Sequence, residues 1–168
     1  LTVGECVLKG DLDEEILFSI HCCHPQLAND NLSAMAVAVE LIEWLSKQSR
    51  RFTYRFVFLP GTIGSITWLA QRAGIVRKNR AGIVLSCLGD SGPIHFKKPR
   101  TDRGLTALVV ESALDARINL NLRPFEPYGY DERQFSSPAF DMQVGNLTRT
   151  PNGKYPEYHT SADDLSFI

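Results

Sequence analysis

Residues 16–33 read ILFSIHCCHPQLANDNLS, and this segment decides the fold because it joins a predicted strand to a predicted helix. Its apolar start predicts a strand that is buried on both faces of a sheet. Residues 33–48 are rich in helix formers, and Asp30, Asn31 or Ser33 can cap that helix. Imidazoles, a carboxylate and amides lie between the two elements. Because open α/β sheets bind ligands where strands end and helices begin, we expect half of a metal site here.

The rest of the chain alternates between strand and helix patterns. Apolar or β-branched runs predict further strands at residues 4–10, 52–59, 81–88, 119–124 and 140–147. Helical spacing of apolar residues predicts helices at residues 64–70 and 102–117. This order predicts an α/β fold, a three-layer αβα sandwich with a mostly parallel sheet and helices on both faces.

Length and composition narrow the classes of function. The 168 residues are 43% hydrophobic and 22% charged, which suits one domain spanning residues 1–168. A net charge of −1 and the lack of a basic stripe argue against nucleic acid as a partner. No apolar run approaches the roughly 18–20 residues that span a bilayer, so we expect no membrane partner.

The cysteines and the chain ends carry two further expectations. The four cysteines form no CxxC pair and no disulfide framework, which indicates a reducing, cytoplasmic location. Leu1 and Ile168 read as cut ends, so we expect a fragment of a longer protein whose flanking domains could mediate oligomer formation.

Polar clusters follow three of the predicted strands. His24 and Asp30 follow the strand at 16–21, Asp90 follows the strand at 81–88, and His159 lies in the polar loop after the last strand. Because the carboxyl ends of parallel strands share one edge of the sheet, these four side chains can converge, and they are ligand types of zinc. Asp30 as a helix cap and Asp90 as a turn residue remain open alternatives. His21 lies on the strand itself, as either a ligand or a packed side chain.

These motifs resemble the zinc aminopeptidases of the aminopeptidase Y and aminopeptidase S type. The similar elements are residues 30–34 (DNLSA), the Gly64-Ser65 helix start, Asp90, residues 130–135 (YDERQF) and residues 158–164 (YHTSADD). The whole chain also resembles aminopeptidase-like proteins associated with bacterial polysaccharide biosynthesis, which carry a Cys-His-Pro segment and a DERQ loop. The resemblance implies a zinc-exopeptidase-like fold and a hydrolase that cuts a peptide or amide bond of a peptide or small-molecule substrate.

The resemblance also implies roles for individual residues. Asp30 would bridge two zinc ions, His24 or His21 and Asp90 would bind one ion, and His159 would bind the other. The site would hold one or two zinc ions, and a water molecule bound by them would attack the amide carbonyl. Apart from the resemblance, we expect Asn31 and Asp131 to support the metal site, and Asp163 could either orient His159 or cap a terminal helix.

One departure from the family pattern puts the activity in doubt. The family has two adjacent glutamates after the second strand of the pattern, one the general base and one a metal ligand. This chain has Gly61 and Thr62 there, which can do neither. Glu132 and Glu157 are the candidate catalytic replacements. The alternative is a catalytically impaired metal- or ligand-binding domain.

The adjacent Cys22 and Cys23 permit a second chemistry, a thiol nucleophile beside a histidine. Neighbouring strand residues point to opposite faces, so only one of these cysteines could face a site. A buried cysteine more commonly packs as a small hydrophobic side chain.

Overall fold

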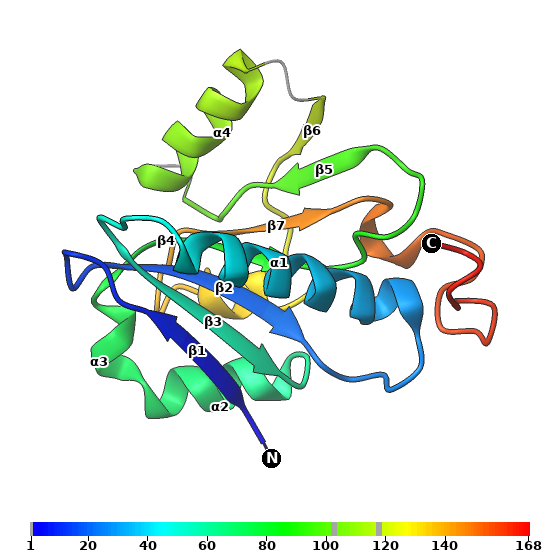
Figure 1. Ribbon diagram of the computed structural model, residues 1–168, viewed down its shortest axis with the longest axis horizontal. Helices are drawn as coiled ribbons and strands as arrows, with labels where there is room; N and C mark the ends of the chain where they lie inside the picture. The colour runs from blue at the N-terminus through cyan, green and yellow to red at the C-terminus, as the bar shows by residue number, and fades with distance from the viewer. Residues whose placement is uncertain (1, 102–103, 117–118) are drawn as a thin grey trace.

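The computed structural model describes residues 2–101, 104–116 and 119–168. Within these ranges one seven-stranded sheet has the order β1-β3-β2-β4-β7-β5-β6 (Figure 1). The strands are β1 (Gly4–Leu8), β2 (Glu15–His21), β3 (Thr53–Leu59), β4 (Asn79–Leu85), β5 (Ile94–Lys97), β6 (Leu120–Arg123) and β7 (Val144–Thr148). The helical segments are η1 (Ala28–Ser33), α1 (Ala34–Ser46), α2 (Ile63–Gln71), α3 (Ala73–Val76), α4 (Leu105–Asp115), α5 (Glu132–Phe135) and η2 (Pro151–Gly153).

The sheet is mostly parallel, as the alternating sequence pattern predicts. β2 pairs in parallel with both β3 and β4, and β4 pairs in parallel with β7. The antiparallel pairs are β1 with β3 and β5 with β7, near the two sides of the sheet. β2, β4 and β7 therefore run the same way, and their carboxyl ends reach one edge of the sheet.

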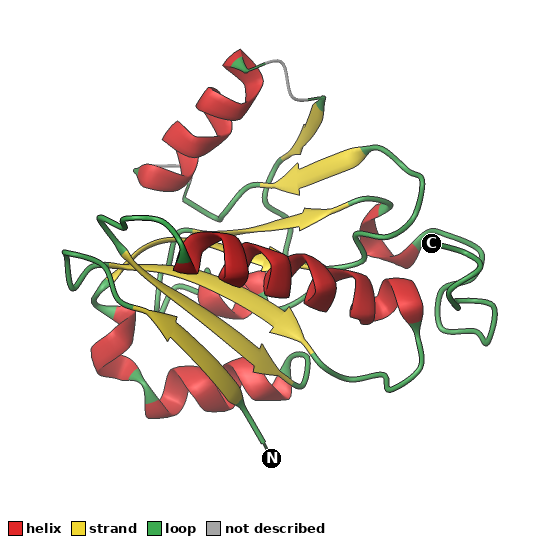
Figure 2. Cartoon of the chain, in the orientation of Figure 1, coloured by secondary structure: helices red, strands yellow, loops and turns green. Residues whose placement is uncertain are grey.

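The period-two side-chain alternation of β2 divides the core into two layers. Ile16, Phe18 and Ile20 belong to a cluster that includes the α1 residues Ala34 and Ala38. Leu17 lies on the other face, in a cluster with residues of α2, α5 and β7. A strand covered on both sides has no solvent-exposed face, which explains why residues 16–18 read as a continuous apolar run. Figure 2 shows α1 on one side of the sheet and α2 on the other.

Three details differ from the sequence expectation. β5 has no place in the predicted order, because its strand geometry depends on pairing with β6 and β7 rather than on an apolar run. The last strand begins at Val144 instead of residue 140, since residues 136–143 first make a tight loop. α4 covers residues 105–115, and the remaining predicted helix positions 102–103 and 117 lie outside the described residues.

No helix in the described parts of the chain is both long and apolar enough to cross a membrane.

Candidate metal centre

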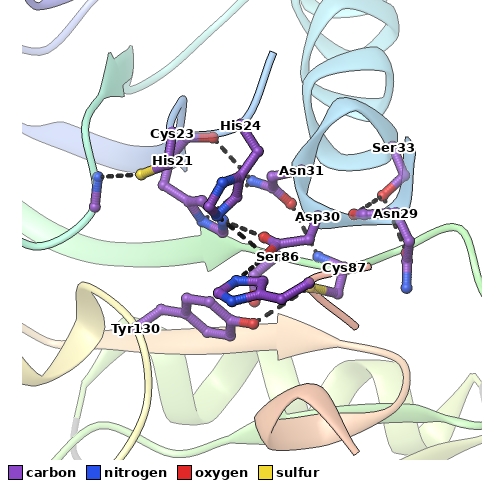
Figure 3. Close-up of polar contacts among 12 residues, drawn as sticks. His21, Cys23, His24, Asn29, Asp30, Asn31, Ser33, Ser86, Cys87 and Tyr130 are labelled. Atoms are coloured by element: carbon purple, nitrogen blue, oxygen red, sulfur yellow. Dashed lines mark hydrogen bonds and ion pairs between the residues drawn. The ribbon is translucent and has the colours of Figure 1, made fainter. Parts of the chain in front are cut away.

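Asp30 is the centre of a cluster of histidines at the carboxyl ends of the strands (Figure 3). It is 1% exposed and lies in η1, just beyond the end of β2. Its Oδ2 atom is 3.0 Å from His159 Nε2 and 3.5 Å from His24 Nε2. Its Oδ1 atom is 2.6 Å from His21 Nε2. One carboxylate therefore contacts three imidazoles that come from two distant parts of the chain.

His24, Asp30 and His159 form a group whose ligand atoms all lie within 4.8 Å of one another. Imidazole nitrogen and carboxylate oxygen are zinc ligands, and catalytic zinc sites commonly use three protein ligands and keep a fourth position open. His21 lies outside this group. It occupies Oδ1 of Asp30 and stacks on Tyr130, with 4.9 Å between ring centroids. Its geometry is that of a residue that orients Asp30.

The electrostatic environment of Asp30 favours the carboxylate that a metal ion needs. Burial opposes ionisation, but the hydrogen bond and charge of His21 and the charges of His24 and His159 outweigh it. The pKa of Asp30 therefore lies below its ordinary value.

A cavity of about 150 Å³ opens beside the group. His24 and His159 line it, and their side chains are 34% and 51% exposed. The buried Asp30 and the two accessible histidines thus give the cluster a closed side and an open side. A small molecule can enter from the open side.

Asn31 ties the ends of β2 and β4 together beneath the cluster. Its amide nitrogen donates to the carbonyl oxygens of His21 and Leu85, both at 3.2 Å. Its amide oxygen accepts a hydrogen bond from the backbone nitrogen of Cys87 at 2.9 Å. Asn31 thus binds the backbone of His21, Leu85 and Cys87 at the ends of the two strands.

The prediction that Asp30, Asn31 or Ser33 caps α1 is wrong. No side-chain capping hydrogen bond is present at the start of α1. The Ser33 hydroxyl donates instead to the carbonyl oxygen of Asn29 at 2.8 Å, while Asp30 and Asn31 face the histidines and the strand ends. The short polar side chains that could cap the helix are engaged in other hydrogen bonds, such as that between Ser33 and the Leu88 backbone nitrogen.

The loop that carries His159 is bound back to η1 through Asp163. The carboxylate of Asp163 accepts hydrogen bonds from the backbone nitrogens of Asn29 at 2.5 Å and Asp30 at 3.1 Å, and from the Tyr155 hydroxyl at 3.1 Å. Tyr158 stacks on His159 with 4.0 Å between centroids. His159 itself has φ 58°, a left-handed conformation that non-glycine residues adopt at a cost. These contacts hold it there.

The remaining predicted site residues lie outside the group. Asp90 accepts hydrogen bonds from Asn29 Nδ2 at 3.0 Å and Thr150 Oγ1 at 2.7 Å. It comes five residues after the last residue of β4. Glu132 is fully buried and ion-paired with Lys97, and Glu157 is half-buried. None of the three lines the cavity among the residues described there.

Cys87 is a residue near the site to which the sequence analysis gave no role, and Cys23 is the one of the two adjacent cysteines that lines the cavity. Cys87, directly beyond β4, is 1% exposed, and its sulfur lies 3.3 Å from the Tyr130 hydroxyl. Burial raises the pKa of its thiol to about 12, so it stays neutral. Cys23 lines the cavity and accepts a hydrogen bond from the Gly61 backbone nitrogen at 2.9 Å. The position of Cys87 after a buried strand was the available signal.

Removal of the Asp163 carboxylate should weaken the centre without removing a ligand. We expect Asp163→Ala to lower zinc affinity roughly 10–100-fold, the range for groups that orient metal ligands. Asp164→Ala is the matched control, because Asp164 is exposed and its hydrogen-bond partners are Ser166 and Phe167 rather than residues of η1. A chelator competition titration measures both variants. Equal affinities would contradict the role given to Asp163.

Comparisons with known proteins agree with this architecture. The family model described as "Domain of unknown function (DUF4910)" matches residues 1–168. A Clostridium acetobutylicum protein named "Putative polysaccharide biosynthesis protein with aminopeptidase-like domain" is 40% identical over 169 residues, which cover 100% of this chain and 39% of the relative. This chain thus spans well under half of that relative's length.

Solved structures extend the comparison to the fold. A crystal structure from Clostridium acetobutylicum, described as that of a "putative peptidase", has a TM-score of 0.93 at 40% identity and covers 99% of this chain and 39% of that chain. A zinc aminopeptidase from Bacillus subtilis has a TM-score of 0.77 at 17% identity, with 98% of this chain and 44% of that chain covered. The second likeness establishes the fold alone. The chain belongs to the family described as Domain of unknown function (DUF4910) and is an aminopeptidase-like domain.

Proposed function

We propose that this domain is a zinc-dependent hydrolase that cuts a peptide or amide bond. The observation that carries the proposal is the His24, Asp30 and His159 group beside an open cavity. The donor set suits zinc, because two imidazoles and one ionised carboxylate leave a coordination position free for a ligand. The family resemblance supports the same reaction.

The residues divide the work of such a site between binding and orientation. His24, Asp30 and His159 would hold the ion, which would supply a Lewis acid that polarises an amide carbonyl. His21 holds Asp30 from behind through Oδ1, and Asp163 fixes the backbone of Asp30. The cavity admits the scissile bond next to the exposed faces of His24 and His159.

Zinc analysis of histidine variants tests the proposal. We expect the purified protein, grown with zinc, to contain the metal and to hydrolyse aminoacyl amides. His24→Ala and His159→Ala should each lose bound zinc and turnover because each removes a ligand. His95→Ala is the matched control, since His95 lies on β5 outside the group. Elemental analysis showing no zinc in the unaltered protein would refute the proposal.

A second candidate function is metal or ligand binding without turnover. The observation that favours it is the pair Gly61 and Thr62, which line the cavity and supply no carboxylate there. This candidate predicts bound zinc and no hydrolysis of any aminoacyl amide. Robust turnover would exclude it.

The substrate is a further part of the proposal. The name of the Clostridium acetobutylicum relative supports a substrate connected with polysaccharide biosynthesis. Because the chain spans 39% of that relative, we propose that flanking segments contribute to substrate choice and to assembly.

A further inference from the structure

Hydrolysis by an activated water molecule requires a group that accepts the water's proton. A carboxylate within reach of the reacting atoms is a common choice. Among the described residues that line the cavity, Asp30 and Asp131 are the two carboxylates. Asp30 is already committed to three histidines. Asp131 is thus the carboxylate left for proton transfer.

Asp131 is held at the cavity wall with one oxygen free. Its side chain is fully buried, and Oδ1 accepts a hydrogen bond from the Ser65 hydroxyl at 2.7 Å. Oδ2 is buried and has no hydrogen-bond partner. An unpartnered buried carboxylate oxygen is costly, and such groups persist where a ligand or a reaction uses them. A molecule bound in the cavity that Asp131 lines could donate a hydrogen bond to Oδ2.

Gly61 lines the same cavity as Asp131 and supplies no side chain there. A Cβ atom built on Gly61 would lie 3.3 Å from Cys23 Sγ and 3.4 Å from His21 Cβ, so a side chain here would press against two residues that line the cavity. Gly61 and Thr62 lead directly into α2, the helix that carries Ser65. The segment at residues 61–65 therefore contributes no carboxylate to the cavity, and its Ser65 hydroxyl binds the carboxylate of Asp131.

We propose that Asp131 is the proton acceptor of this site, since Gly61 and Thr62 supply no carboxylate to the same cavity. The inference rests on the proposed hydrolase function. As a water oxygen adds to the amide carbonyl carbon, one water proton passes to Asp131 Oδ2. When the carbon–nitrogen bond breaks, Asp131 returns that proton to the leaving nitrogen. The carboxylate is thereby regenerated, and no oxidant or reductant is consumed.

The charges around Asp131 suit this role. Burial raises its pKa to about 6, and Glu132 adds to the rise. The Ser65 hydrogen bond and the charges of His21 and Arg133 limit it. A proton acceptor works best when its pKa lies near the operating pH.

Kinetics of the zinc-loaded full chain test the assignment. Asp131→Asn should lower kcat about 10²–10⁴-fold, the usual contribution of a general base, with KM and zinc content unchanged. In the double variant Asp131→Asn with Gly61→Glu, kcat should rise well above that of the single variant. Asp115→Asn, an exposed carboxylate change on α4, should leave kcat unaltered. Unchanged kcat, an effect on KM alone, or loss of zinc in Asp131→Asn would overturn the proposal.

Ser65→Ala gives a finer readout. Without the Ser65 hydroxyl, the pKa of Asp131 should move up, and the acidic limb of the kcat/KM profile should move to higher pH with it. A carboxylate with only a structural role would not shift that limb. An unmoved limb would count against Asp131 as the proton acceptor.

Unfolding of the metal-free protein separates this inference from the proposed function. Because the pKa of Asp131 is raised from 3.8 to about 6 on folding, its protonated form stabilises the folded state. This contribution to the free energy of unfolding is complete below pH 3.8 and is lost as the pH rises through about 6. Asp131→Asn should therefore raise Tm near pH 8 much more than near pH 4. A pH-independent difference would overturn the inference. If the zinc-loaded protein lacks turnover but Gly61→Glu restores it, the metal site stands and Asp131 is excluded as a sufficient proton acceptor.

Discussion

Asp30→Asn should abolish both zinc binding and hydrolysis. The amide removes the negative charge that faces His21, His24 and His159. It also replaces one acceptor oxygen with an NH2 group that cannot bind a metal ion. We expect zinc affinity to fall by more than about 100-fold, beyond the effect of losing a group that merely orients a ligand. Chelator competition and isothermal titration calorimetry measure this loss.

Asp90→Asn provides the decisive comparison for Asp30→Asn. Both substitutions turn a buried carboxylate into an amide, but the Asp90 oxygens contact Asn29, Gly92 and Thr150 rather than the histidines. We therefore expect Asp90→Asn to retain zinc. Loss of zinc from Asp90→Asn, or retention in Asp30→Asn, would show that the metal is bound by a different set of residues.

Arg55→Met should cause a large loss of stability without touching the site. Arg55 on β3 contacts Glu15 on β2 through Nε at 2.7 Å and NH2 at 2.9 Å, and Glu5 on β1 through NH1 at 2.6 Å. Its residue exposure is 8%, and that of Glu15 is 4%. Removing Arg55 leaves the Glu15 charge buried and unpaired. We expect the free energy of unfolding to fall by about 3–5 kcal/mol.

Arg80→Met is the matched control for this stability effect. Arg80 pairs with Glu14, but its side chain is 56% exposed, so water and salt screen the pair. The loss should stay below about 1 kcal/mol. Denaturant titration measures both variants, and zinc content per folded chain should not change in either. Equal losses in Arg55→Met and Arg80→Met would show that burial does not strengthen the Arg55 contacts.

The local sequence pattern was sufficient to predict the strands β2 and β3, and it was insufficient to place β5 and the start of β7. β2 and β3 were predictable because buried parallel strands carry apolar runs, which are visible in the sequence without knowledge of the neighbouring strands. The place of β5 in the sheet was not predictable, because it is set by pairs such as His95 with Thr148 and Phe96 with Leu122. The start of β7 was misplaced for the same reason. Residues 140–143 are as strand-like locally as the residues that follow them.

The sequence by itself determined which chemical groups follow which strands. It placed His24 and Asp30 beyond β2 and His159 in the last loop, and the direction of parallel strands was enough to expect them at one edge. The structure brings these three side chains together. It also places the departure from the family pattern beside them, since Gly61 and Thr62 line the same cavity.

Only the tertiary structure decided which carboxylates are committed and which is free. Asp90, Glu132 and Asp131 look equivalent in sequence, as acidic residues in loops or short turns. Asp90 is occupied by Asn29 and Thr150, and Glu132 by Lys97, while Asp131 keeps Oδ2 without a partner beside the cavity. The physical reason is range. A hydrogen bond is made within about 3 Å, and Asp131 and its partner Ser65 lie 66 residues apart, so no local pattern can reveal which oxygen is left unpaired.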